Sequence, residues 1–355
     1  MGKEKKKPLF IDNASTTPVD ERVLSEMLPY FKEKFGNPSA NNLHAYEPKI
    51  AIERSRNLVS KMLNCKSDQI IFNSGSTEGI NHVLKSTFFS AIQKNKNHII
   101  ISSIEHKAVI EVVDYLESIG CEVTRVEVDT NGLINLNKLS HSITENTFLI
   151  CVMLVNNETG VIQPLGEIVK LAKEKNVPVF TDATQAIGKM SVDVAKLEID
   201  YLCLSAHKIY GPKGVGALYV KNKNDLEPLI HGGSQEKSKR GGTYNVPGIV
   251  GLGKASELIY NNLESRISFY KKYKKEVLSR IVDKDGVENF KNSPKVDNII
   301  SVTLLEHENE EYLINHRNKF SASTGSACLA EIVQDSHVLL ATPGIDPKKV
   351  IRISI

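Results

Sequence analysis

The sequence predicts an α/β fold built on a mostly parallel sheet. Seven short apolar runs rich in β-branched residues recur along the chain, and helical patterns lie between several of them. Alternation of strand and helix gives a parallel sheet with helices on both faces. Ligands of such sheets bind outside the strand ends, so polar residues directly after these runs are the candidate functional residues.

The predicted strands cover residues 69–73, 98–103, 121–127, 147–155, 177–182, 199–205 and 215–220. Helices are predicted over 77–93, 107–118 and 164–175, and one or two long helices over 249–282. A further strand is predicted over 298–305. A chain of 355 residues can hold two domains. We expect a large domain over 15–257 and a smaller α+β domain formed by 1–14 and 258–355.

Composition restricts the class of protein. The net charge of +3, with 25% charged residues, predicts no nucleic-acid surface, and no apolar run is long enough to predict a membrane span. The Lys-rich residues 1–7 are interpreted as a solvated tail, since they fit neither a secretory nor a transit signal. Five cysteines show neither metal-ligand spacing nor a paired framework, so we expect no metal and a cytoplasmic location.

A lysine follows one of the predicted strands directly. The run 201–204 leads into Ser205, Ala206, His207 and Lys208. An amine at the exit of a buried strand, beside hydroxyl and imidazole donors, is placed to form a Schiff base with a carbonyl cofactor. Taken alone, this segment would more often hold a solvated lysine.

Two other strand ends fit the same type of cofactor. Asp182 ends the run 177–182, where an acid can pair with the pyridinium nitrogen of pyridoxal 5'-phosphate (PLP). Ser76 and Thr77 open a predicted helix, whose backbone donors and dipole can hold a phosphate. Taken singly, Asp182 would more often be a turn residue, and the segment Ser76-Thr77-Glu78 a helix cap. The combination favours PLP.

With these residues together, the chain resembles the PLP-dependent cysteine desulfurases, specifically the group with a Ser-Gly-Ser-Ala-Cys type loop. The resemblance runs from about residue 9 to 355 and rests on motifs in a fixed order. These motifs are Asp12-Asn13-Ala14-Ser15-Thr16-Thr17-Pro18, Phe35-Gly36-Asn37-Pro38-Ser39, Glu105-His106-Lys107, Val155-Asn156-Asn157-Glu158-Thr159-Gly160, Asp182-Ala183-Thr184-Gln185, residues 205–214, His231-Gly232-Gly233, Arg240-Gly241-Gly242-Thr243 and Thr324-Gly325-Ser326-Ala327-Cys328. The resemblance implies the fold-type I arrangement of PLP-dependent transferases.

The resemblance also implies roles around the cofactor. Lys208 binds PLP covalently and moves protons between substrate and cofactor, while His106 stacks on the ring with an acid–base contribution. Without the motif, His106 is as readily interpreted as a capping or core histidine. Gln185 binds the ring hydroxyl oxygen, and Asn157 assists at the substrate carboxylate or the ring. The phosphate is held by Ser76, Thr77, Ser205 and His207, and by Thr243 from the neighbouring subunit, which implies a homodimer.

Two further residues carry the expected reaction. Arg352 lies in the alternating run 350–355, which puts Arg352 and Ser354 on one face and three isoleucines on the other. Its planar guanidinium suits the substrate carboxylate. Cys328 is the expected nucleophile, and its thiol, with an ordinary pKa of about 8.5, needs activation by its surroundings. The resemblance implies conversion of L-cysteine to L-alanine, with the sulfur carried as a persulfide on Cys328 to an acceptor protein of iron-sulfur cluster or thio-modification pathways.

The chain departs from the family pattern in two places. Residues 41–48 disturb the usual Ser-x-His-x-x-Gly motif, and the chain ends at Ile355 where family members continue with further helices. We therefore expect a shortened small domain that holds Arg352 less firmly. The alternatives are a catalytically impaired scaffold or sulfur-assembly subunit of the same fold, or another PLP enzyme such as a selenocysteine lyase or an aminotransferase.

Overall fold

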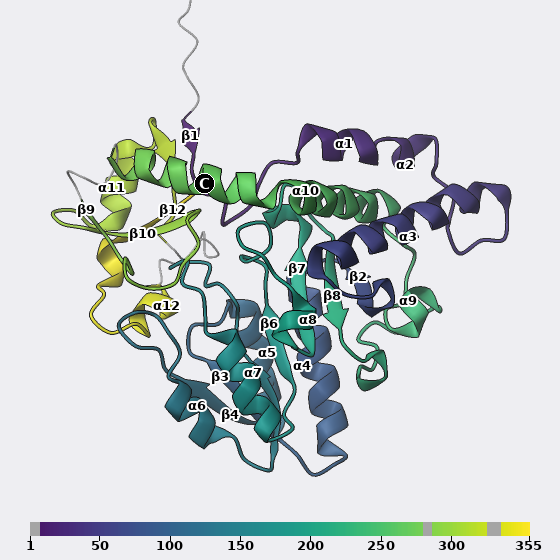
Figure 1. Cartoon of the computed structure of the whole chain (residues 1–355), viewed down its shortest axis with the longest axis horizontal. Coiled ribbons are helices and arrows are strands. Elements are labelled where there is room, and N and C mark those ends of the chain that lie inside the picture. Colours follow the sequence, from purple (N-terminus) through teal and green to yellow (C-terminus); the bar gives the residue numbers. More distant parts are fainter. Residues whose placement is uncertain (1–7, 280–285, 325–334) are drawn as a thin grey trace, which may run out of the picture.

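A seven-stranded sheet forms the centre of the molecule (Figure 1). The computed structural model describes residues 8–279, 286–324 and 335–355. The sheet has the order β2-β8-β7-β6-β5-β3-β4, and only β8 runs antiparallel to its neighbours. Its strands are β2 (Ile70–Asn73), β3 (His98–Ser102), β4 (Glu122–Val126), β5 (Thr147–Cys151), β6 (Val179–Asp182), β7 (Tyr201–Ser205) and β8 (Gly216–Val220). The predicted mostly parallel α/β sheet is confirmed.

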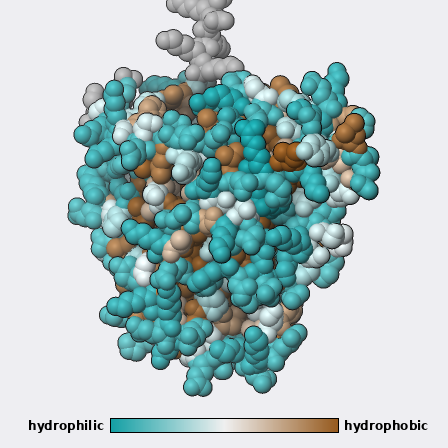
Figure 2. Space-filling view, turned by 45° about the vertical axis from the view of Figure 1, so that its right-hand side comes forward, coloured by the Kyte–Doolittle hydropathy of each residue, from teal (hydrophilic) through white to brown (hydrophobic). Residues whose placement is uncertain are grey.

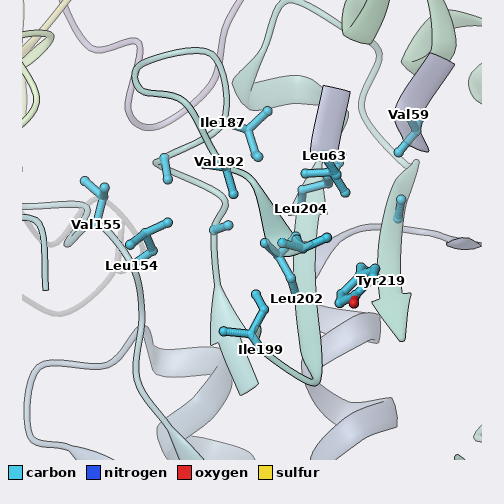
Figure 3. Packing of buried hydrophobic residues seen from close by; sticks show 14 of the residues in the cluster. Val59, Leu63, Leu154, Val155, Ile187, Val192, Ile199, Leu202, Leu204 and Tyr219 are labelled. Atoms are coloured by element: carbon cyan, nitrogen blue, oxygen red, sulfur yellow. The ribbon is translucent and has the colours of Figure 1, made fainter. Parts of the chain in front are cut away.

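Both faces of this sheet are buried, because successive strand residues enter different cores. In β3, Ile99 and Ile101 belong to one hydrophobic cluster and Ile100 to the other. Helices α4 (Ser76–Ile92) and α5 (Lys107–Ser118) cover the first face. The second face is covered by α3 (Leu43–Leu63), α6 (Leu136–Ser142), α7 (Leu165–Glu174) and α10 (Val246–Val277). Figure 3 shows Val59 and Leu63 of α3 with Leu202 and Leu204 of β7 in this second core.

The predicted strand 147–155 is shorter in the structure. β5 ends at Cys151, and residues 152–155 continue as a buried segment outside the strand. Val152 and Leu154 donate their N–H groups to carbonyls of Phe180 and Asp182. The segment therefore stays against β6 while it leads to Asn157.

A second, smaller sheet lies at the far end of α10. Helix α10 runs across the molecule from the large sheet toward this one, with a non-helical residue at Asn262 (φ −132°, ψ 17°) (Figure 1). The small sheet has the antiparallel order β12-β10-β9. Its strands are β9 (Gly286–Glu288), β10 (Ile299–Leu304) and β12 (Val350–Ser354). Ile351, Ile353 and Ile355 enter its hydrophobic core, as the alternation in the sequence predicts.

The first described residues pair with this smaller unit. β1 (Leu9–Phe10) runs parallel to β11 (Phe320–Ser321), and Asp12 bridges to Ser354. This pairing brings the segment 11–15 beside Arg352. The remaining helices are α1 (Glu21–Met27), α2 (Pro29–Lys32), α8 (Val194–Leu197), α9 (Gln235–Ser238), α11 (Asn309–His316) and α12 (His337–Leu340). Within residues 8–279, 286–324 and 335–355, no helix has the length and apolar character that crossing a bilayer requires.

Candidate active site

A cavity of about 310 Å³ lies at the carboxyl ends of the parallel strands. It is lined by Ala14, Ser15, Ser76, Thr77, Ile80, His106, Met153, Val155, Asn157, Asp182, Thr184, Gln185, Ser205, His207, Lys208 and Arg352. Segments far apart in the sequence thus bring together every candidate residue except two. Thr243 is exposed and lies outside this cavity, and Cys328 lies outside the described residues.

A larger groove of about 720 Å³ lies at the opposite edge of the sheet. It is lined by residues at the strand starts, such as Thr147, Val179 and Tyr201. Ligands of parallel sheets bind outside the carboxyl ends of the strands, and the candidate residues gather there. The smaller cavity is therefore the candidate active site.

One end of the cavity is formed by the start of α4. Gly75 precedes the helix with φ +146°, a conformation that L-residues rarely adopt, and a Cβ there would lie 3.2 Å from the Ser205 Oγ. Ser205 accepts a hydrogen bond from the Ser76 N–H at 2.8 Å. The Ser76 hydroxyl lies 3.0 Å from the Ser205 Oγ and 2.5 Å from the Thr184 Oγ1. Three hydroxyls at the N-terminus of a 17-residue helix form a cup suited to an anion.

His207 extends this polar end of the cavity. One of its ring nitrogens, Nδ1, lies 3.1 Å from the Thr16 hydroxyl. Burial, followed by the charge of Lys208, lowers the pKa of His207 to about 4. The imidazole is consequently neutral at pH 7 and can either donate or accept one hydrogen bond there.

Asp182 and His106 also line the cavity. The Asp182 carboxylate ends β6 and accepts the N–H of Thr184 at 2.9 Å. His106 caps α5, with its Nδ1 accepting the Ala108 N–H at 3.1 Å. Burial lowers the pKa of His106, although the nearby Asp182 charge acts in the opposite direction. A neutral His106 with Nδ1 as acceptor carries its proton on Nε2.

Lys208 ends the short 3-10 turn Ala206–Lys208 that follows β7. Its amine donates to the carbonyl oxygens of Ala14 at 2.6 Å and Ser15 at 2.5 Å. Gln185 also donates to the Ala14 carbonyl, at 2.9 Å. The side-chain oxygens of Gln185 and Asn157 are buried and have no hydrogen-bond partner among the described residues. Both residues line the cavity, so these oxygens remain available to a ligand.

Arg352 brings a buried guanidinium to the same cavity from the small sheet. Its Nη2 donates to the Asp12 carboxylate at 2.7 Å, and its Nη1 donates to the Asn157 carbonyl at 3.1 Å. The Arg352 side chain is 3% exposed. Asp12 and Asn157 therefore fix the plane of a group that suits a carboxylate ligand.

Two residues of the site were missed as functional candidates in the sequence, although both lie in motifs used for the resemblance. The Thr184 hydroxyl completes the cup at α4, and the Asp12 carboxylate pairs with Arg352. Thr184 follows a strand end, a signal that would have identified it. Nothing in the sequence pattern predicts that residue 12 lies beside residue 352, because that pairing depends on tertiary structure.

The segment that carries Thr243 is anchored to the large sheet by two ion pairs. Arg56 of α3 binds Glu236 with two hydrogen bonds of 2.7 Å, and both side chains are buried. Arg240 donates to Glu78, in the first turn of α4, at 2.9 Å. Glu236 holds a left-handed conformation with φ +47°. Both anchored residues, Glu236 and Arg240, lie a few positions before the exposed Thr243 in the chain.

The family model described as Aminotransferase class-V matches residues 9–355. A protein named cysteine desulfurase IscS from Dictyoglomus turgidum is 42% identical over 340 residues, which cover 95% of this chain and 86% of that protein. One of the same name from Methanosarcina thermophila is 42% identical over 338 residues, covering 94% and 83% of the two chains.

Solved structures give a similar result. A NifS-like protein superposes with a TM-score of 0.90 at 36% identity, covering 98% of this chain and 93% of that one. A structure titled SspA in complex with cysteine has a TM-score of 0.87 at 36% identity and covers 98% of each chain. The similarity therefore extends over the complete described fold.

Proposed function

The chain belongs to the aminotransferase class-V family, and on this premise we propose that it is a PLP-dependent cysteine desulfurase that converts L-cysteine to L-alanine. The observation that carries the proposal is a single cavity lined by Asp182, His106, Lys208 and Arg352, in a chain about 40% identical to desulfurases along most of its length. An amine, a carboxylate and a guanidinium there match the groups needed to bind a carbonyl cofactor and an amino acid.

The residues of the cavity fit PLP. The hydroxyls of Ser76, Thr184 and Ser205 supply donors for a phosphate, together with Thr77 and His207. Asp182 is buried at the end of β6 and suits a ring nitrogen, which it keeps protonated. The unpartnered Gln185 oxygen suits the ring hydroxyl group as an acceptor, and the amide can also rotate to present its donor. Bound PLP supplies electron withdrawal from the substrate's α-carbon.

Residues of the cavity carry out the proton transfer and hold the substrate. Lys208 attaches the cofactor through its amine and, once displaced by substrate, accepts the proton from the α-carbon. His106 would stack on the ring and, being neutral, would present its Nε2 proton without adding positive charge. Arg352 holds the substrate carboxylate in its plane, with Asn157 beside it. Fixing the carboxylate orients the α-proton toward one acceptor.

Cys328 receives the sulfur in this proposal. Its thiolate sulfur forms an S–S bond with the substrate sulfur while the substrate's Cβ–S bond breaks. The electron pair of the Cβ–S bond stays with the carbon, which takes up a proton, equal in number to the one lost from the Cys328 thiol, and becomes the methyl group of alanine. The two sulfurs are oxidised to the persulfide level, and no external oxidant is consumed. The persulfide sulfur then passes to an acceptor protein of an iron-sulfur or thio-modification pathway.

The reaction is tested by incubating the PLP-loaded protein with L-cysteine and a thiol reductant and measuring alanine and sulfide. We expect equal amounts of the two products. The Cys328→Ser variant should keep the visible absorption of bound PLP and lose sulfide release. A wild-type protein that binds PLP and forms no alanine would contradict the proposal.

We also propose that the working unit is a homodimer. Thr243 is exposed and does not reach the cavity of its own chain, so a second copy is needed for it to contact a phosphate. Hydrophobic surface is present at the upper right of Figure 2, where α1, α2 and the start of α3 lie. Leu43 is 86% exposed and Phe35 is 67% exposed in this region. Arg56 of the same helix α3 anchors the segment that leads to Thr243, so α3 contacts this segment and also starts at the exposed Leu43.

Light scattering of Phe35→Glu tests this interface. We expect a monomer that binds PLP more weakly, because Thr243 of the second copy is lost from the phosphate. Phe269→Glu is the matched control, since Phe269 is similarly exposed but lies in the distal half of α10. A Phe35→Glu variant that stays dimeric would refute this interface.

A further inference from the structure

The turn that carries Lys208 has each of its carbonyl groups bound by a different partner. The Ala206 carbonyl accepts the N–H groups of Ile209 and Gly211 at 3.0 and 2.9 Å. The His207 carbonyl accepts both the N–H and the hydroxyl of Thr17, at 2.9 and 3.0 Å. Backbone N–H groups thus donate to the Ala206 carbonyl, and Thr17 donates to the His207 carbonyl.

The Lys208 carbonyl is bound by a second lysine. The Lys189 amine donates to it at 2.8 Å. After this turn the chain leaves helical geometry, with Ile209 at φ −130° and Tyr210 at φ +63°. The Lys208 carbonyl therefore does not accept a hydrogen bond from the N–H of a following helical turn. A buried carbonyl without a donor would destabilise the turn. Lys189 therefore holds the main chain of the residue whose side chain reaches the cavity.

Lys189 is itself buried in an environment of positive charge. The residue is 8% exposed and follows Gly188 in the segment after β6. The charged groups that act on its amine are Arg266 of α10 and Lys208, and both are cations. The Arg266 guanidinium lies over the Tyr210 ring, 4.9 Å from its centroid, and Tyr210 follows the turn by two residues. Burial, reinforced by these two cations, lowers the pKa of Lys189 to about 7.

We propose that Lys189 is a positioning residue for the reaction: its amine fixes the carbonyl of Lys208, and in its protonated form its positive charge makes the Lys208 nitrogen less basic. The inference rests on the proposed attachment of PLP to Lys208. A cation close to an amine disfavours the protonated form of that amine, and burial strengthens the effect. A less basic Lys208 nitrogen is more readily available to take up a substrate proton near neutral pH.

Other charged groups also face the Lys208 side chain across the cavity. They are Asp182 at the end of β6, His106 at the start of α5, His207 in the same turn and Arg352 of β12. Of these, Asp182 opposes the effect of Lys189 and Arg352 reinforces it. All four remain unchanged when Lys189 is replaced, so a Lys189 variant reports on Lys189 itself.

The test is a pH titration of the visible absorption of PLP-loaded protein, which follows the proton on the Lys208 nitrogen. In Lys189→Gln, which keeps a donor and removes the charge, we expect the titration midpoint to rise by about half a pH unit, because near pH 7 Lys189 is protonated in about half of the molecules. In Lys189→Met, which removes both, we expect the same rise and a lower unfolding temperature. Lys213→Met is the matched control, because Lys213 is an exposed lysine of the next turn and its charge is screened by solvent.

Three results overturn the inference. One is an unchanged midpoint in both Lys189 variants, which would reduce Lys189 to a structural donor. The second is an equal shift in Lys213→Met, which would show that any lost charge has this effect. The third is a rise in Lys189→Met alone, which would assign it to the lost hydrogen bond. A wild-type protein without PLP on Lys208 would instead refute the proposed function, so the two failures are distinguishable.

Discussion

Replacing Glu105 by Gln should change how the stability of the protein depends on pH. Glu105 precedes His106 and is 0% exposed. One carboxyl oxygen accepts the Met153 N–H at 2.9 Å, and the other has no hydrogen-bond partner among the described residues. Burial raises the pKa of Glu105 from 4.5 to about 8. The side chain is therefore protonated in the folded protein at neutral pH and ionised in the unfolded chain.

The direction of the effect follows from this difference. Between pH 4.5 and 8 the unfolded chain binds fewer protons at this position than the folded protein does, so folded stability falls as pH rises. Gln has the same shape and does not titrate. Relative to the Gln variant, the wild type should lose about 2.5 kcal/mol of folding free energy between pH 5.5 and 7.5, because these two pKa values bracket most of that range.

The assay is urea-induced unfolding of both proteins, saturated with PLP, at several pH values in this range. We expect the difference in the free energy of unfolding to grow steadily with pH in favour of Glu105→Gln. A difference that stays constant across the range would refute the reasoning, because it would mean that Glu105 titrates with an ordinary pKa in the folded protein.

Three further substitutions test the site and its supports. Gly75→Ala should weaken PLP binding about tenfold in a PLP titration, because an alanine at this φ adds about 1–3 kcal/mol of backbone strain beside the three hydroxyls of Ser76, Thr184 and Ser205. Gly166→Ala is the control, since a Cβ there meets open space. Glu236→Ala should cost about 3–5 kcal/mol of stability in urea, because it leaves Arg56 buried without its main partner, and a loss below about 1 kcal/mol would contradict this. Arg352→Lys should raise KM for cysteine about tenfold to a hundredfold in steady-state kinetics, with PLP absorption intact, because a bidentate contact is lost; an unchanged KM would contradict it.

The sequence was sufficient to predict the seven strands of the large sheet and the polar residues that follow them. Period-two alternation predicted the orientation of Arg352 and Ile353 in β12, and polar residues after β6 and β7 predicted Asp182 and Lys208 as members of one cavity. The described residues neither confirm nor contradict the role expected of Cys328. These predictions succeeded because strand ends of a parallel sheet share one edge.

Other features could not be predicted because they depend on long-range contacts. The pairing of Asp12 with Arg352 joins residues separated by 340 positions, and it follows from the bridge between the first segment and β12. The contact of Lys189 with the Lys208 carbonyl depends on where the chain leaves helical geometry. The early end of β5 at Cys151 had no sequence signal, because residues 152–155 are as apolar as the strand itself.

The most direct measurement is a peptide mass map of the PLP-loaded protein after borohydride reduction, which fixes the cofactor to the amine that holds it. The proposed function predicts a reduced PLP adduct on Lys208 and unmodified Lys189 and Lys213. An adduct on any other lysine, or none, would contradict the account.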